Sequence, residues 1–276
     1  GPRWRTFSSR YFSTTTAEME QNENIIEVSN LKLSFDDRVI LDGISFQVKP
    51  KSIFVILGGS GSGKTTILRN LLGLIKPDSG NIRIFGTNIV GLSDDELYGV
   101  RKRIGMVFQG GALFNSMTLG ENVALPLEEY TTYPSSVIDS IVDWNLNLVD
   151  LLHAKHLLPA QLSGGMKKRA SIARALSMNP EMLFFDEHTT GLDPVMAAEL
   201  DEIILRLKRE LDITVVVVTH DMTSIRRIAD CGIMLYDGHI ITRGTLAEME
   251  ASTDIRAIEF FRNHEAKEKE KINGDK

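Results

Sequence analysis

Three short runs of consecutive apolar residues stand out along the chain: Ile53–Leu57, Met182–Phe185 and Val215–Val218. Each run has the length of a strand, and continuous apolar character is typical of parallel strands that are buried on both faces. Between the last two runs, Pro194–Leu211 has helical spacing and starts with proline, a residue favoured in the first helical turn. The order strand, helix, strand predicts a βαβ unit and therefore an α/β fold with a parallel sheet.

Further strands and helices are predicted in the first part of the chain. Ile25–Leu33 and Val39–Val48 alternate well enough to predict two strands, joined by the turn-like pair Asp36-Asp37. We predict a helix over Lys64–Leu74 and another strand over Ile104–Phe108. With 276 residues, the chain has room for one α/β domain with a subdomain, or for two small domains.

The two ends of the chain differ from the rest in composition. The first sixteen residues hold three arginines and many hydroxyl side chains, with no acid before Glu18, as in an organelle transit peptide. Gly1-Pro2 also resembles the scar of a protease cleavage, which would make the segment a remnant of recombinant expression and Met19 the natural start. We leave both explanations open and exclude residues 1–24 from the fold as a disordered leader. The charged run Glu265–Lys276 is expected to be a solvated or frayed end.

Composition excludes several classes of protein. The net charge of −6 gives no reason to expect a nucleic-acid partner, which usually requires a basic surplus. A single cysteine, Cys231, excludes a disulfide within the chain and fits a reducing compartment, and we expect it to be a small buried hydrophobic side chain. No apolar stretch approaches the ~20 residues that a membrane-spanning helix needs. If the protein serves a membrane process, another chain must supply the membrane part.

A glycine-rich loop between the strand Ile53–Leu57 and the following helix matches G-x-x-x-x-G-K-[ST]. Its glycines let backbone amides converge on phosphate oxygens, and the helix N-terminus adds its positive end. Lys64 is expected to reach the β- and γ-phosphates, and the hydroxyl of Thr65 to coordinate Mg²⁺. The residues predicted to bind ATP here are Gly58, Gly59, Ser60, Gly61, Ser62, Gly63, Lys64, Thr65 and Thr66.

Two acids, Asp186 and Glu187, follow the apolar run Met182–Phe185. The carboxyl ends of strands are where open α/β sheets bind ligands. We predict that Asp186 holds Mg²⁺ through water and that Glu187 polarises the water that attacks ATP. Without the glycine-rich loop, the same pair would be read as a solvated strand end.

Leu162-Ser-Gly-Gly-Met166 resembles the LSGGQ signature of the ABC ATPases, and it opens a predicted helix. It occurs in order with the phosphate loop, Gln109, Asp186-Glu187, Thr190-Gly-Leu-Asp193 and His220. The resemblance covers about residues 25–250. It implies an ATPase whose Ser163, Gly164 and Gly165 face the γ-phosphate that is held by an opposite subunit.

The same resemblance assigns four further residues. Gln109 corresponds to the Q-loop residue, which contacts Mg²⁺ and senses the transmembrane partner. Asp193 corresponds to the acid at the dimer interface, and His220 to the switch histidine near the γ-phosphate. Phe35 matches the aromatic residue that stacks on adenine, and packing within a strand is the lesser alternative.

Two residues depart from the family pattern. Met166 replaces the usual glutamine of the signature, and His188 follows Glu187 where the family usually has proline. Because histidine neither fixes φ nor lacks an N–H, His188 is expected to alter the turn that carries Glu187. The acids are intact, so neither change predicts an inactive enzyme. We expect His188→Pro to leave hydrolysis unchanged or to raise it.

A narrower resemblance links the chain to the ATPases of MCE-type lipid transporters, on the stretches Leu97–Phe114, Asn122–Pro126 and Leu162–Arg169. Asp254–Phe261 is similar to the short segment that ends those subunits. This resemblance implies phospholipid transport with an integral-membrane permease and an MCE-type lipid-binding protein. The permease is expected to contact Gly110–Pro126, where the apolar residues that could line its groove are Leu113, Phe114, Met117 and Leu119. An importer or exporter of another substrate, or a non-transport ABC ATPase, remains the alternative.

The family resemblance also implies an architecture. We expect a RecA-like α/β P-loop ATPase core over residues 25–250, an antiparallel β subdomain near its start, and a helical subdomain over about 112–175 that carries the signature. Residues 251–276 are expected to form a C-terminal tail. Two subunits should enclose two ATP molecules head to tail. The assembly should be peripheral on the cytoplasmic face of the cell membrane, or on an organelle inner membrane if the leader is a transit peptide.

Overall fold

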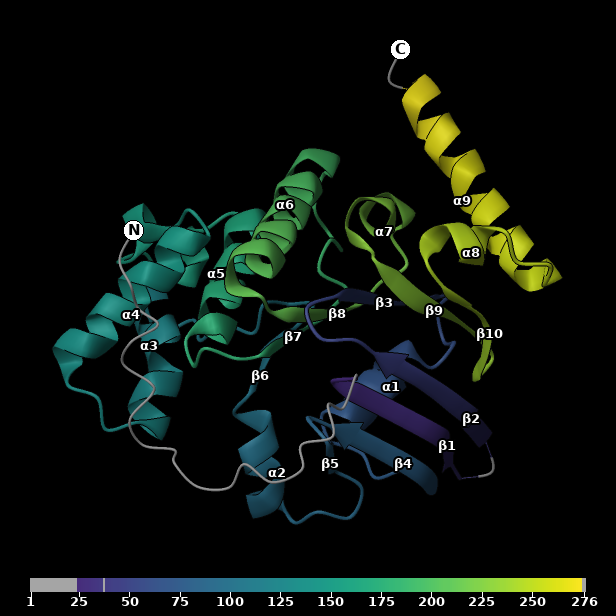
Figure 1. Cartoon of the computed structure of the whole chain (residues 1–276). Helices are drawn as coiled ribbons and strands as arrows, with labels where there is room; N and C mark the ends of the chain where they lie inside the picture. Colours follow the sequence, from purple (N-terminus) through teal and green to yellow (C-terminus); the bar gives the residue numbers. More distant parts are fainter. Residues whose placement is uncertain (1–23, 37, 275–276) are drawn as a thin grey trace.

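The computed structural model describes residues 24–36 and 38–274 (Figure 1). Its strands are β1 (Ile26–Phe35), β2 (Arg38–Val48), β3 (Ile53–Gly58), β4 (Ser79–Ile84), β5 (Thr87–Asn88), β6 (Ile104–Val107), β7 (Met182–Asp186), β8 (Thr214–Val218), β9 (Cys231–Tyr236) and β10 (His239–Gly244). Its α-helices are α1 (Lys64–Leu71), α2 (Asp94–Arg101), α3 (Leu119–Tyr130), α4 (Ser135–Leu148), α5 (Gly164–Leu176), α6 (Pro194–Leu211), α7 (Met222–Ile228), α8 (Leu246–Glu250) and α9 (Ile255–Gly274). Two short 3₁₀ helices, η2 (Leu152–Ala154) and η3 (Pro159–Gln161), precede α5.

The larger sheet has the strand order β10-β9-β3-β8-β7-β6. Its pairs β9/β3, β3/β8, β8/β7 and β7/β6 are parallel, and only β10 joins its neighbour in antiparallel fashion. A second sheet, β2-β1-β4-β5, is antiparallel throughout. The α/β fold with a parallel sheet and an antiparallel sheet near its start, as predicted from the sequence, is therefore confirmed.

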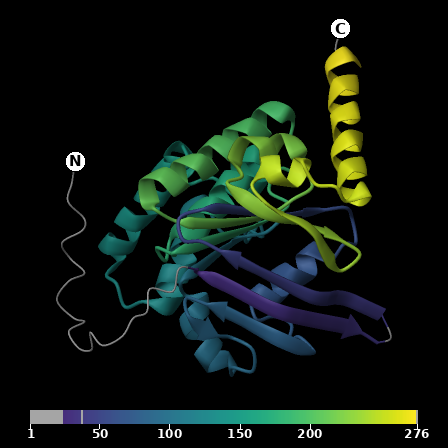
Figure 2. The ribbon, with the colours of Figure 1, turned by 45° about the vertical axis from the view of Figure 1, so that its right-hand side comes forward.

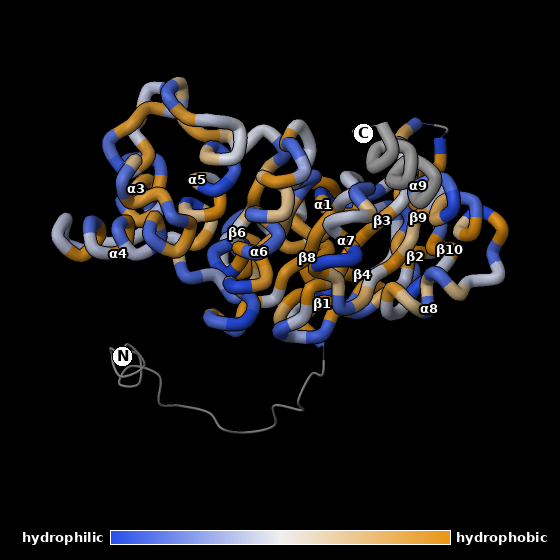
Figure 3. The backbone as a smooth tube through the Cα atoms, turned by 90° about the horizontal axis from the view of Figure 1, so that it is seen from above, coloured by the Kyte–Doolittle hydropathy of each residue, from blue (hydrophilic) through white to orange (hydrophobic). Residues whose placement is uncertain are grey.

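The apolar runs that predicted β3, β7 and β8 lie in the centre of the parallel sheet, where the chain is strongly hydrophobic (Figure 3). Alternate side chains of each strand enter two different cores. Val55 and Leu57 of β3 pack on the side of α3 to α7, whereas Phe54 and Ile56 pack towards α1 and the antiparallel sheet. Burial on both faces explains why these strands contain no polar alternation.

Helices α3 to α7 form a layer on one face of the parallel sheet, and the antiparallel sheet, α1 and α2 lie on the other face (Figures 1 and 2). Residues 112–175 contain α3, α4 and nearly all of α5, which pack against one another at one end of this layer. Across residues 24–36 and 38–274, no helix is both long enough and apolar enough to cross a membrane.

The structure differs from the sequence prediction at several element ends. Helix α1 ends at Leu71, three residues earlier than predicted, because Gly73 adopts a positive φ of 64° just beyond it. The predicted tail 251–276 contains α9, in which Ala257 and Phe261 are buried in the core, so its first turns belong to the folded domain. The helix continues to Gly274, away from the body of the molecule (Figures 1 and 2).

Candidate active site

The glycine-rich loop connects the buried end of β3 to the start of α1. Gly58, Gly61 and Gly63 all have positive φ, of 148°, 75° and 104°, which L side chains rarely adopt. Gly63 is the N-cap of α1, and a Cβ atom on it would lie 2.8 Å from Leu41 Cδ2. The loop can therefore turn backbone amides and a helix N-terminus towards one point only with glycine at these positions.

Lys64 folds back over this loop. Its Nζ atom donates to the carbonyl oxygens of Gly58 and Gly59, at 2.9 Å each, and the residue is 8% exposed. Burial lowers the pKa of Lys64, while the negative charges of Glu187 and Asp186 act in the opposite direction. An ammonium held this way can exchange carbonyl oxygens for phosphate oxygens at little cost in hydrogen bonds.

Two polar atoms beside the loop are buried and lack a hydrogen-bond partner among the residues that the structure describes: Ser62 Oγ and Asp186 Oδ1. Burial, and then the charge of Glu187, raises the pKa of Asp186, although Arg69, Lys64 and Lys168 act against this rise. A buried carboxylate oxygen without a donor fits a hard cation such as Mg²⁺, which prefers oxygen ligands. The residues present therefore fit Mg²⁺ bound together with a nucleotide.

Glu187 and His220 come from adjacent parallel strands, after β7 and β8. His220 Nδ1 lies 3.0 Å from Glu187 Oε1, and the hydroxyl of Thr190 donates to Glu187 Oε2 at 3.2 Å. The Glu187 amide donates to Val218 O at 2.8 Å, and its φ of 53° is left-handed. This unusual backbone turns the carboxylate back towards His220, so the pair can accept a proton and orient a water molecule.

Ser163 lies at the N-terminus of α5, where its Oγ accepts from Met166 N at 3.2 Å as the helix cap. Ser163 and Gly164 are exposed, whereas Gly165 is buried against Met196. Met166 packs on the hydrophobic core, which is a role that a glutamine would fill less well. The signature therefore presents a capped, exposed helix N-terminus, to one side of α1 in Figures 1 and 3.

Phe35, Gln109 and Asp193 lie at exposed positions. Phe35 ends β1 and is 47% exposed, and Gln109 follows β6. Asp193 caps α6, because its Oδ1 accepts from Val195 N at 2.9 Å and from Met196 N at 3.0 Å. Its position before Pro194 thus has a structural reason that is independent of any partner subunit.

Sequence reasoning missed two basic residues of α5 that hold the segment after Gln109. Lys168, which is 6% exposed, donates from Nζ to the carbonyl oxygens of Gln109 and Glu187. Arg174 donates to the carbonyl oxygens of Ala112 and Gly111, at 2.6 and 3.2 Å. The contacts with Gln109, Gly111 and Ala112 join residues about sixty positions apart, so only the packing of α5 against β6 reveals them.

The four apolar residues expected to line a permease groove do not share one environment. Leu119 is fully buried in the core, so its predicted role in a groove is wrong. Leu113 packs partly on the same core, and Met117 is half-buried. Phe114 is 52% exposed and is the one of the four that is freely available to a partner.

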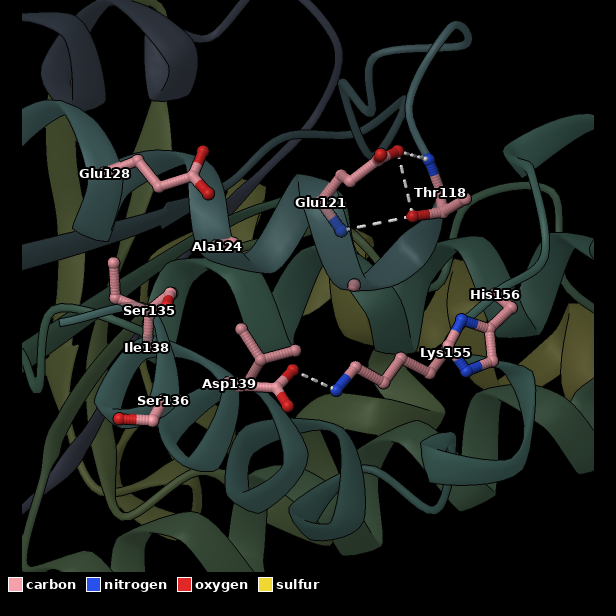
Figure 4. Close-up of a pocket in the computed structure, with 12 residues that line it drawn as sticks. Thr118, Glu121, Ala124, Glu128, Ser135, Ser136, Ile138, Asp139, Lys155 and His156 are labelled. Atoms are coloured by element: carbon pink, nitrogen blue, oxygen red, sulfur yellow. Dashed lines mark hydrogen bonds and ion pairs between the residues drawn. The ribbon is translucent and has the colours of Figure 1, made fainter.

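A pocket of about 530 Å³ lies outside this site, between α3, α4 and residues 155–156 (Figure 4). Its wall mixes apolar and polar side chains: Glu121 closes the capping box of α3 with Thr118, and Lys155 pairs with Asp139. Within the part of the chain that the structure describes, its lining includes no residue of Gly58–Thr66. It is therefore distinct from the predicted nucleotide site.

Comparisons with known proteins place this arrangement in a family. Residues 41–190 match the family model for ABC transporters. The intermembrane phospholipid transport system ATP-binding protein MlaF of Haemophilus influenzae is 42% identical over 241 residues, which are 87% of this chain and 91% of that protein. The probable ribonucleotide transport ATP-binding protein mkl of Mycobacterium tuberculosis is 39% identical over 238 residues, which are 86% of this chain and 66% of that protein.

Solved structures agree. The chain is similar to cbiO1 from Clostridium perfringens, part of the ABC transporter complex cbiONQ, with a TM-score of 0.78, 31% identity and coverage of 84% of this chain and 93% of that one. It is also similar to the dimeric, post-hydrolysis ATP-binding cassette MJ0796 bound to ADP and Pi, with a TM-score of 0.74, 31% identity and coverage of 80% and 98%. Fold and site together define a P-loop ATPase. The chain belongs to the ABC transporter family, as an ATP-binding and ATP-hydrolysing subunit.

Proposed function

We propose that this subunit energises the transport of phospholipids between membranes, through a separate integral-membrane permease and an MCE-type lipid-binding protein. The observation that carries the proposal is the 42% identity to MlaF, a phospholipid transport subunit, over nearly the whole of both chains. The resemblance to MCE-type ATPases at Leu97–Phe114 and Leu162–Arg169 supports it independently of that name.

In the proposed reaction, the amides of Gly58–Gly63 and the ammonium of Lys64 hold the phosphates of ATP. Thr65, Gln109 and Asp186 hold Mg²⁺, which when bound neutralises phosphate charge. Glu187 accepts the proton of the attacking water, and His220, 3.0 Å from its carboxylate, orients that carboxylate and the water. Phe35, at the end of β1, stacks on the adenine.

The proposed active site is shared between two copies of the chain. The exposed N-terminus of α5, with Ser163, Gly164 and Gly165, would face the γ-phosphate on the P-loop of the other copy. The dimeric form of MJ0796, which is 31% identical, supports a homodimer. Asp193, exposed at the start of α6, would then lie at the dimer interface.

The permease would contact the segment Gly110–Pro126, and Phe114 is the side chain best exposed for a partner helix. In this proposal the ATPase dimer is peripheral on the cytoplasmic face of the membrane that holds the permease. No observation on the described residues supports the organelle location, since the leader on which it depends lies outside residues 24–36 and 38–274.

Copurification from native membranes tests the proposal. The full-length chain is isolated in mild detergent, and its bound proteins and lipids are identified and compared with those of a mock preparation. We expect a permease, an MCE-domain protein and phospholipid above background. Amino-acid or metal permeases without lipid would contradict the lipid assignment. Bound ribonucleotide transport components would instead favour the substrate named for mkl.

A further inference from the structure

His188, the residue beside Glu187, enters a buried polar cluster. His188 and Asp201 are both 0% exposed, and His188 Nε2 lies 3.0 Å from Asp201 Oδ1. The edge of the imidazole also contacts Phe185, with ring centroids 5.8 Å apart. A buried carboxylate is costly unless donors satisfy it, so this contact is a built feature of the fold rather than a chance of surface packing.

Two residues of α7 complete the cluster. The hydroxyl of Ser224, which is 1% exposed, donates to Asp201 Oδ1 at 2.6 Å. Arg227 donates from Nη1 to Asp201 Oδ2 at 2.9 Å. Asp201, which lies on α6, thus accepts hydrogen bonds from α7 and from His188 in the loop after β7.

The hydrogen-bond pattern assigns the imidazole tautomer. Asp201 only accepts, and the Ser224 proton is used on Asp201, so His188 Nε2 carries the proton that points to Asp201. His188 Nδ1 is buried and has no partner among the described residues. A proton there would bury a second donor without an acceptor, so the pattern places the ring proton on Nε2.

The cluster joins three segments that carry proposed site residues. His188 follows Glu187 directly, α6 begins after Asp193, and α7 begins two residues after His220. Fixing His188 and Ser224 to one carboxylate therefore fixes the chain that presents Glu187 relative to the chain that presents His220. The family's usual proline restricts this loop through φ, whereas here a side-chain contact is available to restrict it.

We propose that His188 is a positioning residue, which through Asp201 holds the Glu187 carboxylate at its place beside His220 in ATP hydrolysis. The inference rests on the proposed role of Glu187. It also changes the expectation drawn from sequence alone: His188→Pro removes the Nε2 donor from a buried carboxylate, so it lowers activity instead of leaving it unchanged or raising it.

The test compares variants that keep or remove the donor, in the full-length chain alone and with its copurified membrane partner. In His188→Leu, kcat falls about tenfold or more, equivalent to ~1.4 kcal/mol in barrier height. The KM for ATP stays within about twofold, because the nucleotide-binding loop is not altered. His188→Gln, whose amide N–H can replace the Nε2 donor, restores most of kcat, and His188→Pro behaves like His188→Leu.

A double-mutant cycle with Asp201→Asn shows whether the two residues act together. If His188→Leu acts through Asp201, the double variant has a kcat no lower than the worse single variant. Asn145→Leu is the matched control, since Asn145 is a buried polar residue of α4 that bonds only to its own helix at Ile141 O among the described contacts. It should lower the thermal midpoint while leaving kcat unchanged.

Several outcomes decide the matter. A folded His188→Leu protein with wild-type kcat overturns the proposal. So does a fall in kcat, at constant KM, that His188→Gln does not rescue. If His188→Leu does not fold, Arg227→Gln takes its place: a lower kcat at constant KM supports the proposal, and a wild-type kcat overturns it. Glu187→Gln, measured in parallel, separates a failure of the proposal for His188 from a failure of the proposed role of Glu187. Full turnover by Glu187→Gln would refute the role of Glu187 itself.

Discussion

The carboxylate of Asp186 fits a bound cation, but its burial destabilises the folded protein when no cation is bound. Its Oδ1 atom is buried without a partner in the described part of the chain, and burial raises its pKa. The ionised form is therefore less favourable in the folded protein than in water. The cost is present above the raised pKa, and it shrinks as the pH falls from that pKa to the ordinary pKa of the unfolded chain, because the folded carboxyl becomes protonated first.

Asp186→Asn should accordingly separate stability from activity. The neutral amide removes the buried charge, so the thermal midpoint without nucleotide and Mg²⁺ is expected to rise, by roughly 2–4 °C for each kcal/mol recovered. Hydrolysis should be lost, because the amide is a weaker ligand for Mg²⁺. Differential scanning calorimetry and a Mg²⁺ titration of ATPase activity measure the two effects. A lower midpoint would mean that Asp186 has a stabilising contact that the geometry does not show.

Glu187→Gln should block chemistry and preserve binding. The amide keeps the shape of the side chain, but it cannot accept a proton, so hydrolysis is expected to fall by ~10²–10⁴. ATP should then accumulate in a closed dimer, which size exclusion with radiolabelled nucleotide detects. Lys64→Ala is the contrasting variant, since it weakens nucleotide binding itself. Turnover of Glu187→Gln within a few-fold of wild type would remove Glu187 from the role of base.

At the residue scale, the sequence predicts the candidate ATP-binding residues but not the side chains that support them. The loop Gly58–Thr65 and the pair Asp186-Glu187 are visible because their chemistry is local in sequence. Lys168 and Asp201 are not, because they contact the site through elements that meet only when helices pack on the sheet. The one hint was His188 itself, whose departure from proline marked a position that the fold must constrain in another way.

Among the elements, the segment before α3 depends on one side chain. Asn122 is 1% exposed, and its Oδ1 accepts from Phe114 N at 2.8 Å. Its Nδ2 donates to the carbonyl oxygens of Phe114, Met117 and Thr118, at 3.1, 3.1 and 2.9 Å. The side chain thereby replaces the hydrogen bonds of a regular element, and it fixes the loop that exposes Phe114.

Asn122→Leu should loosen this loop. Each buried backbone group left without a partner costs about 1–3 kcal/mol, so the thermal midpoint falls. Copurification of the proposed permease should fall as well, whereas basal hydrolysis by the isolated chain stays within about twofold, since the nucleotide site is untouched.

Phe114→Ala is the matched variant for that prediction. It removes a side chain that is 52% exposed, so permease copurification should fall with little change in midpoint. If both variants kept full copurification, the permease would not contact this segment.

Helices and strands were predictable from sequence where the burial of their side chains follows one simple pattern along the whole element. The runs that became β3, β7 and β8 are buried on both faces, and α6 spans Pro194–Leu211 as predicted. Helix α2 was missed although Ser93 and Glu96 form a capping box, a signal that lies in the sequence. The core position of α9 was missed: its Ala257 and Phe261 join the core, and the helix contacts α8 and β10, which precede it directly in the chain.

At the scale of the whole molecule, the two features proposed to contact phosphate lie apart in one chain. The P-loop opens α1, whereas the signature opens α5, in the helical layer to one side of it (Figures 1 and 3). Ser163 already uses its Oγ to cap its own helix and leaves the helix N-terminus exposed. A site that needs both features is therefore best formed by two chains, each of which supplies one.

Mixed dimers test this arrangement without a new structure. With Lys64→Ala on one subunit and Ser163→Arg on the other, both defects fall in the same composite site, and the second site keeps an intact P-loop and an intact signature. With both substitutions on one subunit, each site has one defect, because its P-loop and its signature come from different chains. We therefore expect clearly higher ATPase activity from the first mixture, measured on tagged heterodimers purified in two affinity steps. Equal activity in the two mixtures, together with no ATP-dependent dimer in analytical ultracentrifugation, would show that each subunit hydrolyses ATP by itself.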